Sequence, residues 1–480
     1  MTSTPSLPHA MRLSLTLLAT ALLCACATTP PPQAATTPAL PAQWGTPGAA
    51  GGGAGSISPD WWRSLGSAEL DGLVQAAQAQ SLDAAAAAAR LRQAEAAARQ
   101  AGAALLPAVS ASVDAGRQAR FSGGGSTDGT AANRYAAGFA ASYEIDFWGR
   151  QRAGHDAALA RLQASAFDQG TVGLTLTAAV ADAWLRLVGG RERLAIAGLN
   201  LQGAERVLAL VDARARAGAA TPLERAQQRG LVATQRQAIE ALRQQVQGQH
   251  TALAVLLGQA TPPPVQADTL AGLQPPSIGA GLPAELLVRR PDVARAEAQL
   301  AAAHADLRAA RAALLPRITL GAGLGVGADR LGRTFDHPLY SLAAGLTAPI
   351  FDGGRLAAGA DIQEARRDEL LAQYRAAIVA AVGDAEVALQ AVAGTDAQTT
   401  AQAQVLEQAQ QAHALAQVRY RAGADTLLTL LDAQRTLYAA QDNAALLRQA
   451  RLMASVALYK ALGGGWQPTG VVAGVGMGRP

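Results

Sequence analysis

The chain alternates between two spacings of apolar residues. From Ala68 to Leu106, apolar side chains recur at helical intervals and lead into a long run of alanines, as in an amphipathic helix. Four shorter stretches instead place an apolar side chain at every second position: residues 109–115, 135–145, 318–326 and 340–350. That period is typical of β-strands. The pattern therefore predicts long helices interrupted by two pairs of strands.

The other side of the predicted strands carries small or polar residues, among them Asp114, Glu144 and Asp146. Runs of about ten residues with one apolar side match the strands of outer-membrane barrels. A soluble antiparallel hairpin with one buried face gives the same pattern. The presence of four such strands, an export signal, and polar loops at 122–133 and 329–337 favours the membrane interpretation. In it, the three carboxylates face the barrel lumen.

The two halves of the chain repeat each other. The letters AALLP end at Pro107 and again at Pro316, and a Gly-Arg pair begins at Gly149 and again at Gly354. The stretches RARAGA and RYRAGA place Gly218 and Gly423 at equivalent points. The spacing is 69 residues both from Gly149 to Gly218 and from Gly354 to Gly423. A segment that long without insertion behaves like a helix whose register matters, so the sequence predicts a duplicated unit.

Each repeated glycine stands between two long helix-favouring stretches. Gly218 is followed by Thr221-Pro222, and Gly423 by Asp425-Thr426. A glycine C-cap followed by such an N-cap predicts a tight turn between two helices. At about 1.5 Å per residue, the helices that enter the turns reach about 100 Å, and the returning helices, residues 222–257 and 427–462, reach about 54 Å. Both turns are therefore predicted tips of helical hairpins.

The first 58 residues have the composition of an export signal and a tether. Met11-Arg12 precedes an apolar run that ends at Leu23, so residues 1–25 are a predicted signal peptide. Leu23-Cys24-Ala25-Cys26 resembles the lipobox of bacterial lipoproteins, with Cys26 as the lipidated first residue of the mature chain. The alternative is an ordinary signal peptide cleaved near Ala25 or Ala27. Residues 26–58 are rich in Pro and Gly and predict a lipid-anchored linker.

The remaining sequence divides at changes in composition. We expect a first repeat at 59–265, a Pro/Gly-rich crossover at 266–283, a second repeat at 284–463 and a flexible tail at 464–480. Half of the residues are apolar but only 4% are aromatic, which suits alanine-rich helices packed closely side by side.

Charge and motifs exclude several classes of function. With 40 basic and 36 acidic residues the net charge is +4, and no basic run with interleaved aromatics indicates nucleic-acid binding. The six histidines are scattered, and neither a nucleophile elbow nor a phosphate loop occurs. The sequence therefore predicts no enzyme, no metal site and no cofactor.

A membrane location would require several copies of the chain. After the signal, no run approaches the roughly 18 to 20 apolar residues of a membrane helix, so a chain that crosses a membrane would do so as a barrel. Four strands cannot close a barrel, and each unpaired backbone group in lipid costs several kcal/mol. Three copies would supply twelve strands, an even number within the bacterial range.

The sequence resembles the TolC-like outer-membrane efflux proteins, and within them the OprM/NodT-type lipoprotein branch. Four motifs carry this resemblance: LLVRRPD at 286–292, AALLP at 312–316, DFWGR at 146–150 and RYRAGADTLLTLLDAQR at 419–435. With the repeat they cover nearly all of residues 59–463. The resemblance implies an α+β membrane protein: a homotrimer whose 12-stranded outer-membrane β-barrel continues into a periplasmic α-helical coiled-coil tunnel. Such a tunnel exports solutes that an inner-membrane pump passes on through a periplasmic adaptor.

The resemblance also assigns roles at the tips. The implied periplasmic gate residues are Tyr420, Arg421, Asp432 and Arg435. The implied adaptor-docking residues are Arg214, Arg216, Gly218, Arg419 and Gly423. Three copies of Asp432 around an axis would repel one another unless arginine side chains compensated their negative charge. The alternative is that Asp432 and Arg435 form an ordinary solvated helix pair.

Two classes of function stay open. The first is a passive efflux conduit for drugs or other small molecules, with type I protein secretion as a variant. The second is a structural or adhesive trimeric surface protein. The duplicated strand-and-helix unit favours the conduit, because an adhesin of that kind has one barrel segment and no repeat. The residues do not reveal the cargo.

Overall fold

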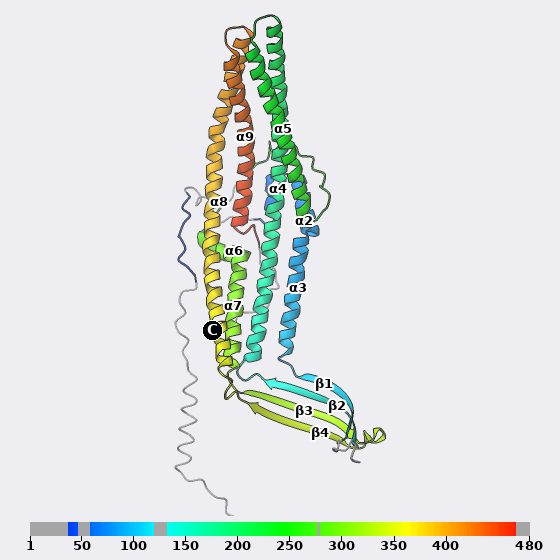
Figure 1. Cartoon of the computed structure of the whole chain (residues 1–480). Coiled ribbons are helices and arrows are strands. Elements are labelled where there is room, and N and C mark those ends of the chain that lie inside the picture. Colours follow the sequence, from blue (N-terminus) through cyan, green and yellow to red (C-terminus); the bar gives the residue numbers. More distant parts are fainter. Residues whose placement is uncertain (1–36, 47–57, 120–131, 276–278, 467–480) are drawn as a thin grey trace, which may run out of the picture. The chain divides into compact units, whose positions relative to one another are not determined.

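The computed structural model describes residues 37–46, 58–119, 132–275 and 279–466 (Figure 1). Contacts divide the chain into Met1–Ala39 and Leu40–Pro480. All the helices and strands described below belong to the second unit.

The four predicted strands form one antiparallel sheet in the order β1-β2-β3-β4. They are β1 (Ala108–Gln118), β2 (Ala132–Ile145), β3 (Arg317–Ala328) and β4 (Pro338–Thr347). One rung joins Ala111, Phe139, Leu324 and Tyr340 across all four strands. Directly paired residues point to the same side, so the register gathers the predicted apolar positions on one face.

The apolar face of the sheet is open. Phe139 is 62% exposed and Tyr340 is 81% exposed. Asp114 pairs with Ala136 and Glu144 with Thr319, one position out of phase with the apolar rungs, so both carboxylates belong to the opposite face. The predicted two-sided pattern is therefore confirmed.

The helices follow the predicted repeat. The longer ones are α2 (Ala68–Gln80), α3 (Leu82–Ala103), α4 (Arg150–Arg216), α5 (Pro222–Leu256), α7 (Pro291–Ala312), α8 (Arg355–Arg421) and α9 (Leu427–Ala461). The shorter ones are η2 (Trp61–Leu65), η3 (Pro283–Glu285), α6 (Leu286–Arg289) and η4 (Leu331–Arg333). Helices α4 and α8 both have 67 residues, and α5 and α9 both have 35.

Neighbouring helices pack in a simple order. Helices α3, α4, α7 and α8 lie side by side, each in contact with the next. Helix α5 folds back along α4, and α9 folds back along α8, which makes two hairpins (Figure 1). Contacts between α4 and α9 join one hairpin to the other.

The single helix predicted for residues 68–106 is wrong at Ser81. This residue has an extended backbone and separates α2 from α3. The two parts pack differently: α2 buries Leu70 and Val74 in a cluster with Trp61 and Trp62, whereas alanine-rich α3 lies along α4. The bend at Ser81 allows α2 to pack in this cluster and α3 to pack along α4. The two tryptophans are core residues, and Trp61 stacks on Tyr459 at 4.8 Å.

Part of the predicted linker is packed against the helices. Trp44 is buried in a cluster with residues of α7, α8 and α9, and its indole N–H donates to the carbonyl of Gly281 at 2.9 Å. The Gly45 N–H and the Thr46 hydroxyl both donate to Glu386 of α8. Residues 40–46 are therefore not a free tether as expected. The reason is that burying the large indole of Trp44 is favourable, which the Pro/Gly-rich composition of the linker does not indicate.

The start of the predicted tail is also packed. The ring of Trp466 meets Phe167 edge to face at 5.6 Å. Residues 467–480 lie outside the described part of the chain.

The expectation that no segment is apolar enough for a membrane helix is wrong. Windows of 18 residues in α4 and in α8 pass that test of length and composition. The window in α4 is mostly buried inside the chain, which is typical of a core helix.

Candidate functional site

The two hairpin tips have the same backbone turn. Gly218 and Gly423 both adopt φ 72°, a left-handed conformation that favours glycine. After them, the N–H of Ala219 donates to the carbonyl of Arg214 at 2.8 Å, and the N–H of Ala424 donates to that of Arg419 at 2.9 Å. These bonds close the helix ends as in a Schellman motif. The predicted glycine caps are therefore present in both tips.

The first tip begins its returning helix with a capping box. The Thr221 hydroxyl accepts from the Glu224 N–H at 3.2 Å, and the Glu224 carboxylate accepts from the Thr221 N–H at 2.6 Å. Pro222 occupies the first helical position, where its missing N–H costs nothing. Below the turn, Asp212 of α4 accepts from Arg225 of α5 at 2.8 Å. Side chains of the first hairpin therefore join its two helices next to the turn.

The second tip has an aspartate just before the N-cap residue of its returning helix, and no side chain caps that helix. Asp425 accepts from the Thr426 N–H at 2.8 Å and from the Thr429 hydroxyl at 2.9 Å. Arg419 donates to the other oxygen of this carboxylate at 3.1 Å. The hydrogen bonds from Thr426, Thr429 and Arg419 hold the pKa of Asp425 below its ordinary value. Arg419, a predicted docking residue, is therefore bound within its own turn.

Arg214 of the first tip reaches across to the second. Its Nη1 donates to the backbone carbonyl of Tyr420 at 2.7 Å, and its guanidinium lies over the tyrosine ring, 4.6 Å from the centroid. Tyr420 is only 1% exposed. Burial raises the pKa of its phenol, and Glu224 raises it further while Arg214 lowers it. The structure thus brings a predicted docking residue and a predicted gate residue into contact.

The other predicted gate residues lie apart. Asp432 and Arg435 are both exposed on α9 and form no ion pair with each other or with another described residue. Arg435 lines a groove of about 890 Å³ formed by α4, α5 and α9, whose lining includes the ion pair of Arg193 with Asp442. Arg421 is exposed at the end of α8. The alternative of a solvated Asp432–Arg435 pair is not seen in this chain.

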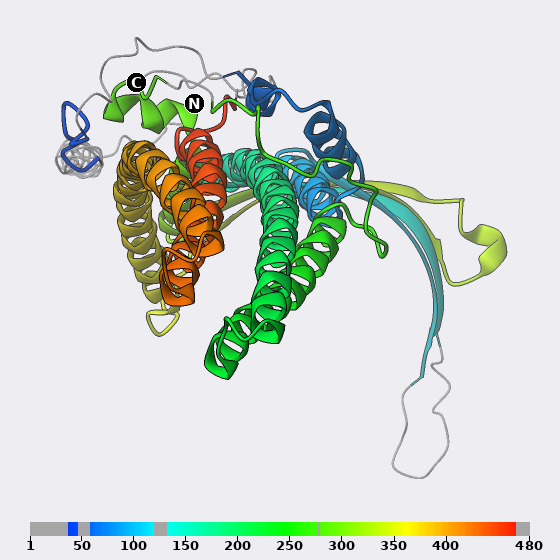
Figure 2. The ribbon, with the colours of Figure 1, turned by 90° about the horizontal axis from the view of Figure 1, so that it is seen from above.

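The remaining predicted docking residues lie on open surface. Arg216 is exposed and donates to the carbonyl of Asp212 at 3.4 Å. A Cβ atom added to Gly218 or Gly423 would meet no atom within 4 Å. Seen from above, the two hairpins show separate ends (Figure 2). Nothing in the described chain covers either turn.

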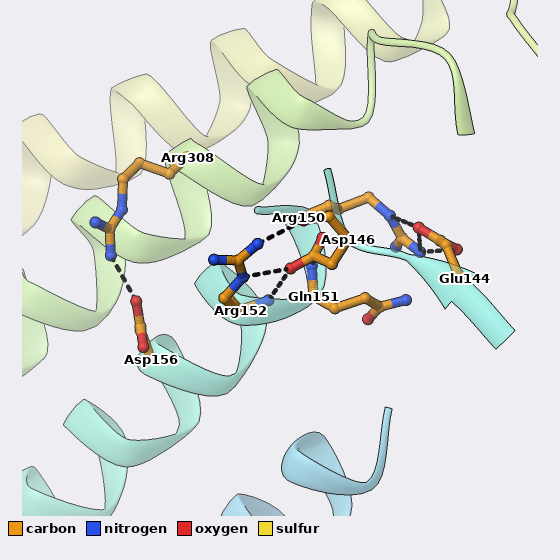
Figure 3. A network of polar contacts seen from close by, with 7 residues as sticks. All are labelled: Glu144, Asp146, Arg150, Gln151, Arg152, Asp156 and Arg308. Atoms are coloured by element: carbon orange, nitrogen blue, oxygen red, sulfur yellow. Dashed lines mark hydrogen bonds and ion pairs between the residues drawn. The ribbon is translucent and has the colours of Figure 1, made fainter. Parts of the chain in front are cut away.

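The joint between β2 and α4 contains two of the predicted lumen carboxylates (Figure 3). Glu144 accepts from Arg150 with both oxygens, the shortest contact being 2.7 Å. Asp146 lies just beyond β2 and accepts from the N–H groups of Gln151 and Arg152 at 2.9 and 2.8 Å. It therefore caps α4, a use that its place in the alternating pattern did not indicate. Asp114 lies on an exposed strand.

Two further predictions from the sequence concern lipidation and metal binding. Cys26 lies outside the described residues. Within the described ranges, no group of three or more His, Cys, Asp or Glu side chains could hold a metal ion.

The sequence could not reveal two features of the tips. Nothing in the spacing of Arg214 shows that it turns toward Tyr420, because that direction depends on how the two hairpins pack. The pair Asp425-Thr426 indicated the start of the returning helix, but not the bond between Asp425 and Arg419.

A four-stranded sheet with an open apolar face, joined to two equivalent long hairpins, defines the class of outer-membrane channel subunits with a duplicated unit. The sequence matches the family described as outer membrane efflux protein over residues 73–259 and 282–464, with one match in each repeat. The chain belongs to this family.

Relatives extend this match over almost the whole chain. The pyoverdine export outer membrane protein OpmQ of Pseudomonas aeruginosa is 51% identical over 457 residues, which cover 93% of this chain and 95% of the relative. The OpmQ of Pseudomonas putida is 49% identical, with coverage of 93% and 96%. The solved structure of the outer-membrane channel OprN matches with a TM-score of 0.83 and 28% identity, covering 92% of this chain and 100% of that one. The protein is thus an outer-membrane channel of an efflux system and not an enzyme.

Proposed function

We propose that three copies of this chain form a passive conduit through the outer membrane and receive small molecules from an inner-membrane pump through a periplasmic adaptor. The observation that carries this proposal is the sheet. Within the described residues β1 pairs only with β2, and β4 only with β3, so both outer edges lack a partner while the apolar face is exposed. Unpaired edges are unfavourable in lipid, and a neighbouring copy that pairs β1 with β4 removes them.

Oligomeric mass and cross-linking test the assembly. Single cysteines along β1 combined with single cysteines along β4 should give disulfide-linked trimers in mild detergent. Matched pairs on β1 and β3, which are separated by β2, should give none. A monomeric mass in detergent and no β1–β4 cross-link at any register would contradict the proposal.

The membrane anchor is a separate part of the proposal. The lipobox-like stretch places the lipid on Cys26. Mass spectrometry of the purified protein should show a mature chain that begins at a lipidated Cys26, and Cys26→Ala should lose the lipid. Cys24→Ala is the control and should keep it. An unmodified chain that begins at another residue would rule out lipidation.

The gate and the docking surface belong to the tips. Asp432, Arg435 and Arg421 are charged, exposed and unpaired within the described chain, so neighbouring copies are their available partners. Together with Tyr420 they form the proposed gate. The open turns at Gly218 and Gly423, with Arg216 beside the first, form the proposed docking surface for the adaptor. Arg214 and Arg419 lie just before these turns and donate hydrogen bonds to the Tyr420 carbonyl and to Asp425, respectively.

The cargo is proposed from the relatives. Two proteins named for pyoverdine export share 51% and 49% identity with this chain over nearly its full length. Expression in a Pseudomonas aeruginosa strain that lacks its OpmQ should restore pyoverdine in the culture medium. Failure to restore it, with the channel present in the outer membrane, would reject this cargo. Secretion of a protein through the same channel would favour the type I alternative.

A further inference from the structure

The apolar face of the sheet ends in an arginine. In the register of β1 with β2, Arg117 pairs with Asn133, and the next rung on the same face pairs Ala115 with Tyr135. Strand residues alternate between the two faces, so Arg117 shares the face of Phe139 and the other exposed apolar side chains. Among the described strand residues, it is the one charged side chain on that face. A charge in this place needs polar surroundings.

The register also places Arg117 at the edge of the membrane. On β2 the apolar face extends from Tyr135 to Ile145, which at about 3.3 Å per residue is about 33 Å along the strand. A strand tilted by about 40° rises about 25 Å over that length, which is the height of the apolar band of outer-membrane barrels. Arg117 lies one rung beyond Tyr135 and therefore at the level of the lipid headgroups. An arginine on a lipid-facing strand is far better tolerated there than at the midplane.

Arg117 lies at the end of the sheet that points away from the helices. The four joints between strands and helices are at the other end, at Ala108, Ile145, Arg317 and Thr347 (Figure 1). In the proposed conduit the helices are periplasmic, so the end with Arg117 reaches the outer leaflet. The outer leaflet of a bacterial outer membrane consists largely of glycolipids whose headgroups carry phosphates. Arg117 therefore faces an anionic lipid surface.

The connection from β3 to β4 lies at the same end and has a matching composition. Arg330 and Arg333 are exposed, and between and beside them Leu331 and Phe335 are 71% and 78% exposed. Thr334 is buried, and its hydroxyl donates to the carbonyl of Leu331 at 2.8 Å. The connection is thus a folded turn that presents both cationic and large apolar side chains.

The arginines at this end have no competing partner in the chain. Arg117, Arg330 and Arg333 form no ion pair with another residue of the described ranges. A guanidinium binds phosphate oxygens with two parallel hydrogen bonds, which makes arginine a preferred phosphate ligand. Asp329 and Asp336 of the same connection also lack an ion pair within those ranges, and carboxylates can share a divalent cation with phosphates.

The proposed trimer brings these side chains together. When β1 of one copy pairs with β4 of the next, the outer end of β1 lies beside the start of β4, where the connection ends. Arg117 of one copy then meets Arg330 and Arg333 of its neighbour at each of the seams between copies. A cluster of basic side chains next to an apolar surface is typical of sites for anionic lipid headgroups.

We infer that each seam carries a lipid site at its outer rim, and that its ligand is a phosphorylated glycolipid of the outer leaflet. This inference rests on the proposed trimer, which supplies the two halves of the site. Arg117, Arg330 and Arg333 bind the phosphates of the headgroup. Leu331 and Phe335 contact the acyl chains just below it. The site fixes the depth of the barrel in the membrane through the lipid that surrounds it.

Native mass spectrometry of full-length trimers in mild detergent tests the site, because it reports assembly and bound lipid together. The probes are lipid A with two phosphates, the same lipid with both phosphates removed, and phosphatidylglycerol. Diphosphorylated lipid A should bind at up to three copies per trimer, one for each seam, and at least about tenfold more tightly than either other probe.

The triple variant Arg117→Gln/Arg330→Gln/Arg333→Gln should weaken binding of diphosphorylated lipid A by at least about tenfold, because charge-assisted hydrogen bonds to phosphate are lost. Arg117→Lys keeps the charge and should lose less than Arg117→Gln. Arg134→Gln is the matched control: Arg134 is exposed and pairs with Gly116, one position out of phase with Arg117, so it lies on the opposite face. Its affinity should stay within about twofold of the wild type.

Three outcomes would overturn the lipid site. Equal affinity for the phosphorylated and dephosphorylated lipids would mean that the arginines do not bind phosphate. Equal affinity for phosphatidylglycerol would mean that the rim attracts any anionic lipid. An equal loss in Arg134→Gln and in the triple variant would mean that net charge alone matters. In each of these cases an intact trimer leaves the proposed conduit standing, whereas a monomeric mass for the wild-type protein contradicts the trimer itself.

Discussion

The two hairpin tips share a backbone turn but differ in what their side chains do. In the first, a threonine and a glutamate cap the returning helix, and Arg214 leaves its own hairpin to contact Tyr420. In the second, Asp425 accepts from the N–H of the N-cap residue Thr426 and holds Arg419 within the turn. The glycines and their hydrogen bonds are the same in both. The duplicated unit therefore preserved the turn while the side chains around it diverged.

The same difference continues into the returning helices. The second hairpin exposes Asp432 and Arg435 on α9, whereas the equivalent positions of the first hold Gln227 and Gly230. At these two positions, charge is therefore present only in the second hairpin. The first hairpin supplies the arginine that contacts Tyr420, and the second hairpin supplies the proposed gate residues.

The largest effect should come from bulk at the tips. Gly423→Trp should abolish export by the assembled pump and leave trimer mass unchanged, because the indole would occupy open space in front of the turn. The left-handed backbone adds a cost of about 1–2 kcal/mol for any side chain. Export by cells and co-purification with the adaptor measure the loss.

Two variants separate the causes of that loss. Gly423→Ala carries the backbone cost without the bulk and should keep most of the export. Gly218→Trp makes the same change on the first tip and shows whether the adaptor needs both. If Gly423→Trp trimers couple normally, the docking role of the tips is wrong.

A smaller effect should distinguish the two caps. Thr221→Ala removes a capping box and should weaken the start of α5 by about 1 kcal/mol. Thr426→Ala should change little, because that side chain makes no capping hydrogen bond to the start of α9. Hydrogen exchange of the first-turn amides reports both. Equal loss of protection in the two variants would mean that the caps are alike after all.

The smallest effect concerns pH. The pKa of Asp425 is lower in the folded protein than its ordinary value of 3.8. The stability that this carboxylate contributes is therefore fully present above that ordinary value, and it is lost as the pH falls through the lower pKa of the folded state. Protection of the Thr426 amide, which donates to this carboxylate, should fall below about pH 4 after correction for intrinsic exchange. Asp425→Asn should show weaker protection at neutral pH and no such fall. A wild-type tip that keeps its protection throughout would contradict this role of the carboxylate.

Much of the fold could be predicted from the sequence. Strand faces follow from a period of two, and the equivalent helices follow from glycines with conserved spacing between the halves. The return helices begin where predicted, at Pro222 and Leu427, and end one residue early. These features are local, so neighbouring residues specify them.

What could not be predicted depends on distant parts of the chain. The break at Ser81 reflects two packing surfaces, and Trp44 finds its place only when α7, α8 and the crossover are assembled. The direction of Arg214 requires the second hairpin beside the first. The alternative interpretation, a solvated pair of Asp432 with Arg435, follows from their spacing, yet α9 leaves both side chains exposed and without an ion pair between them.

The measurement that tests the account most directly is the ion conductance of purified trimers with and without charge at the second tip. Wild-type trimers should conduct weakly, while Asp432→Ala and Arg435→Ala should conduct several-fold more, because contacts between copies that hold the gate shut are removed. Glu240→Ala, an exposed charge on α5 that pairs with Arg243, is the control and should change nothing. Trimers that show no conductance even after Asp432→Ala would contradict a conduit gated at its tips.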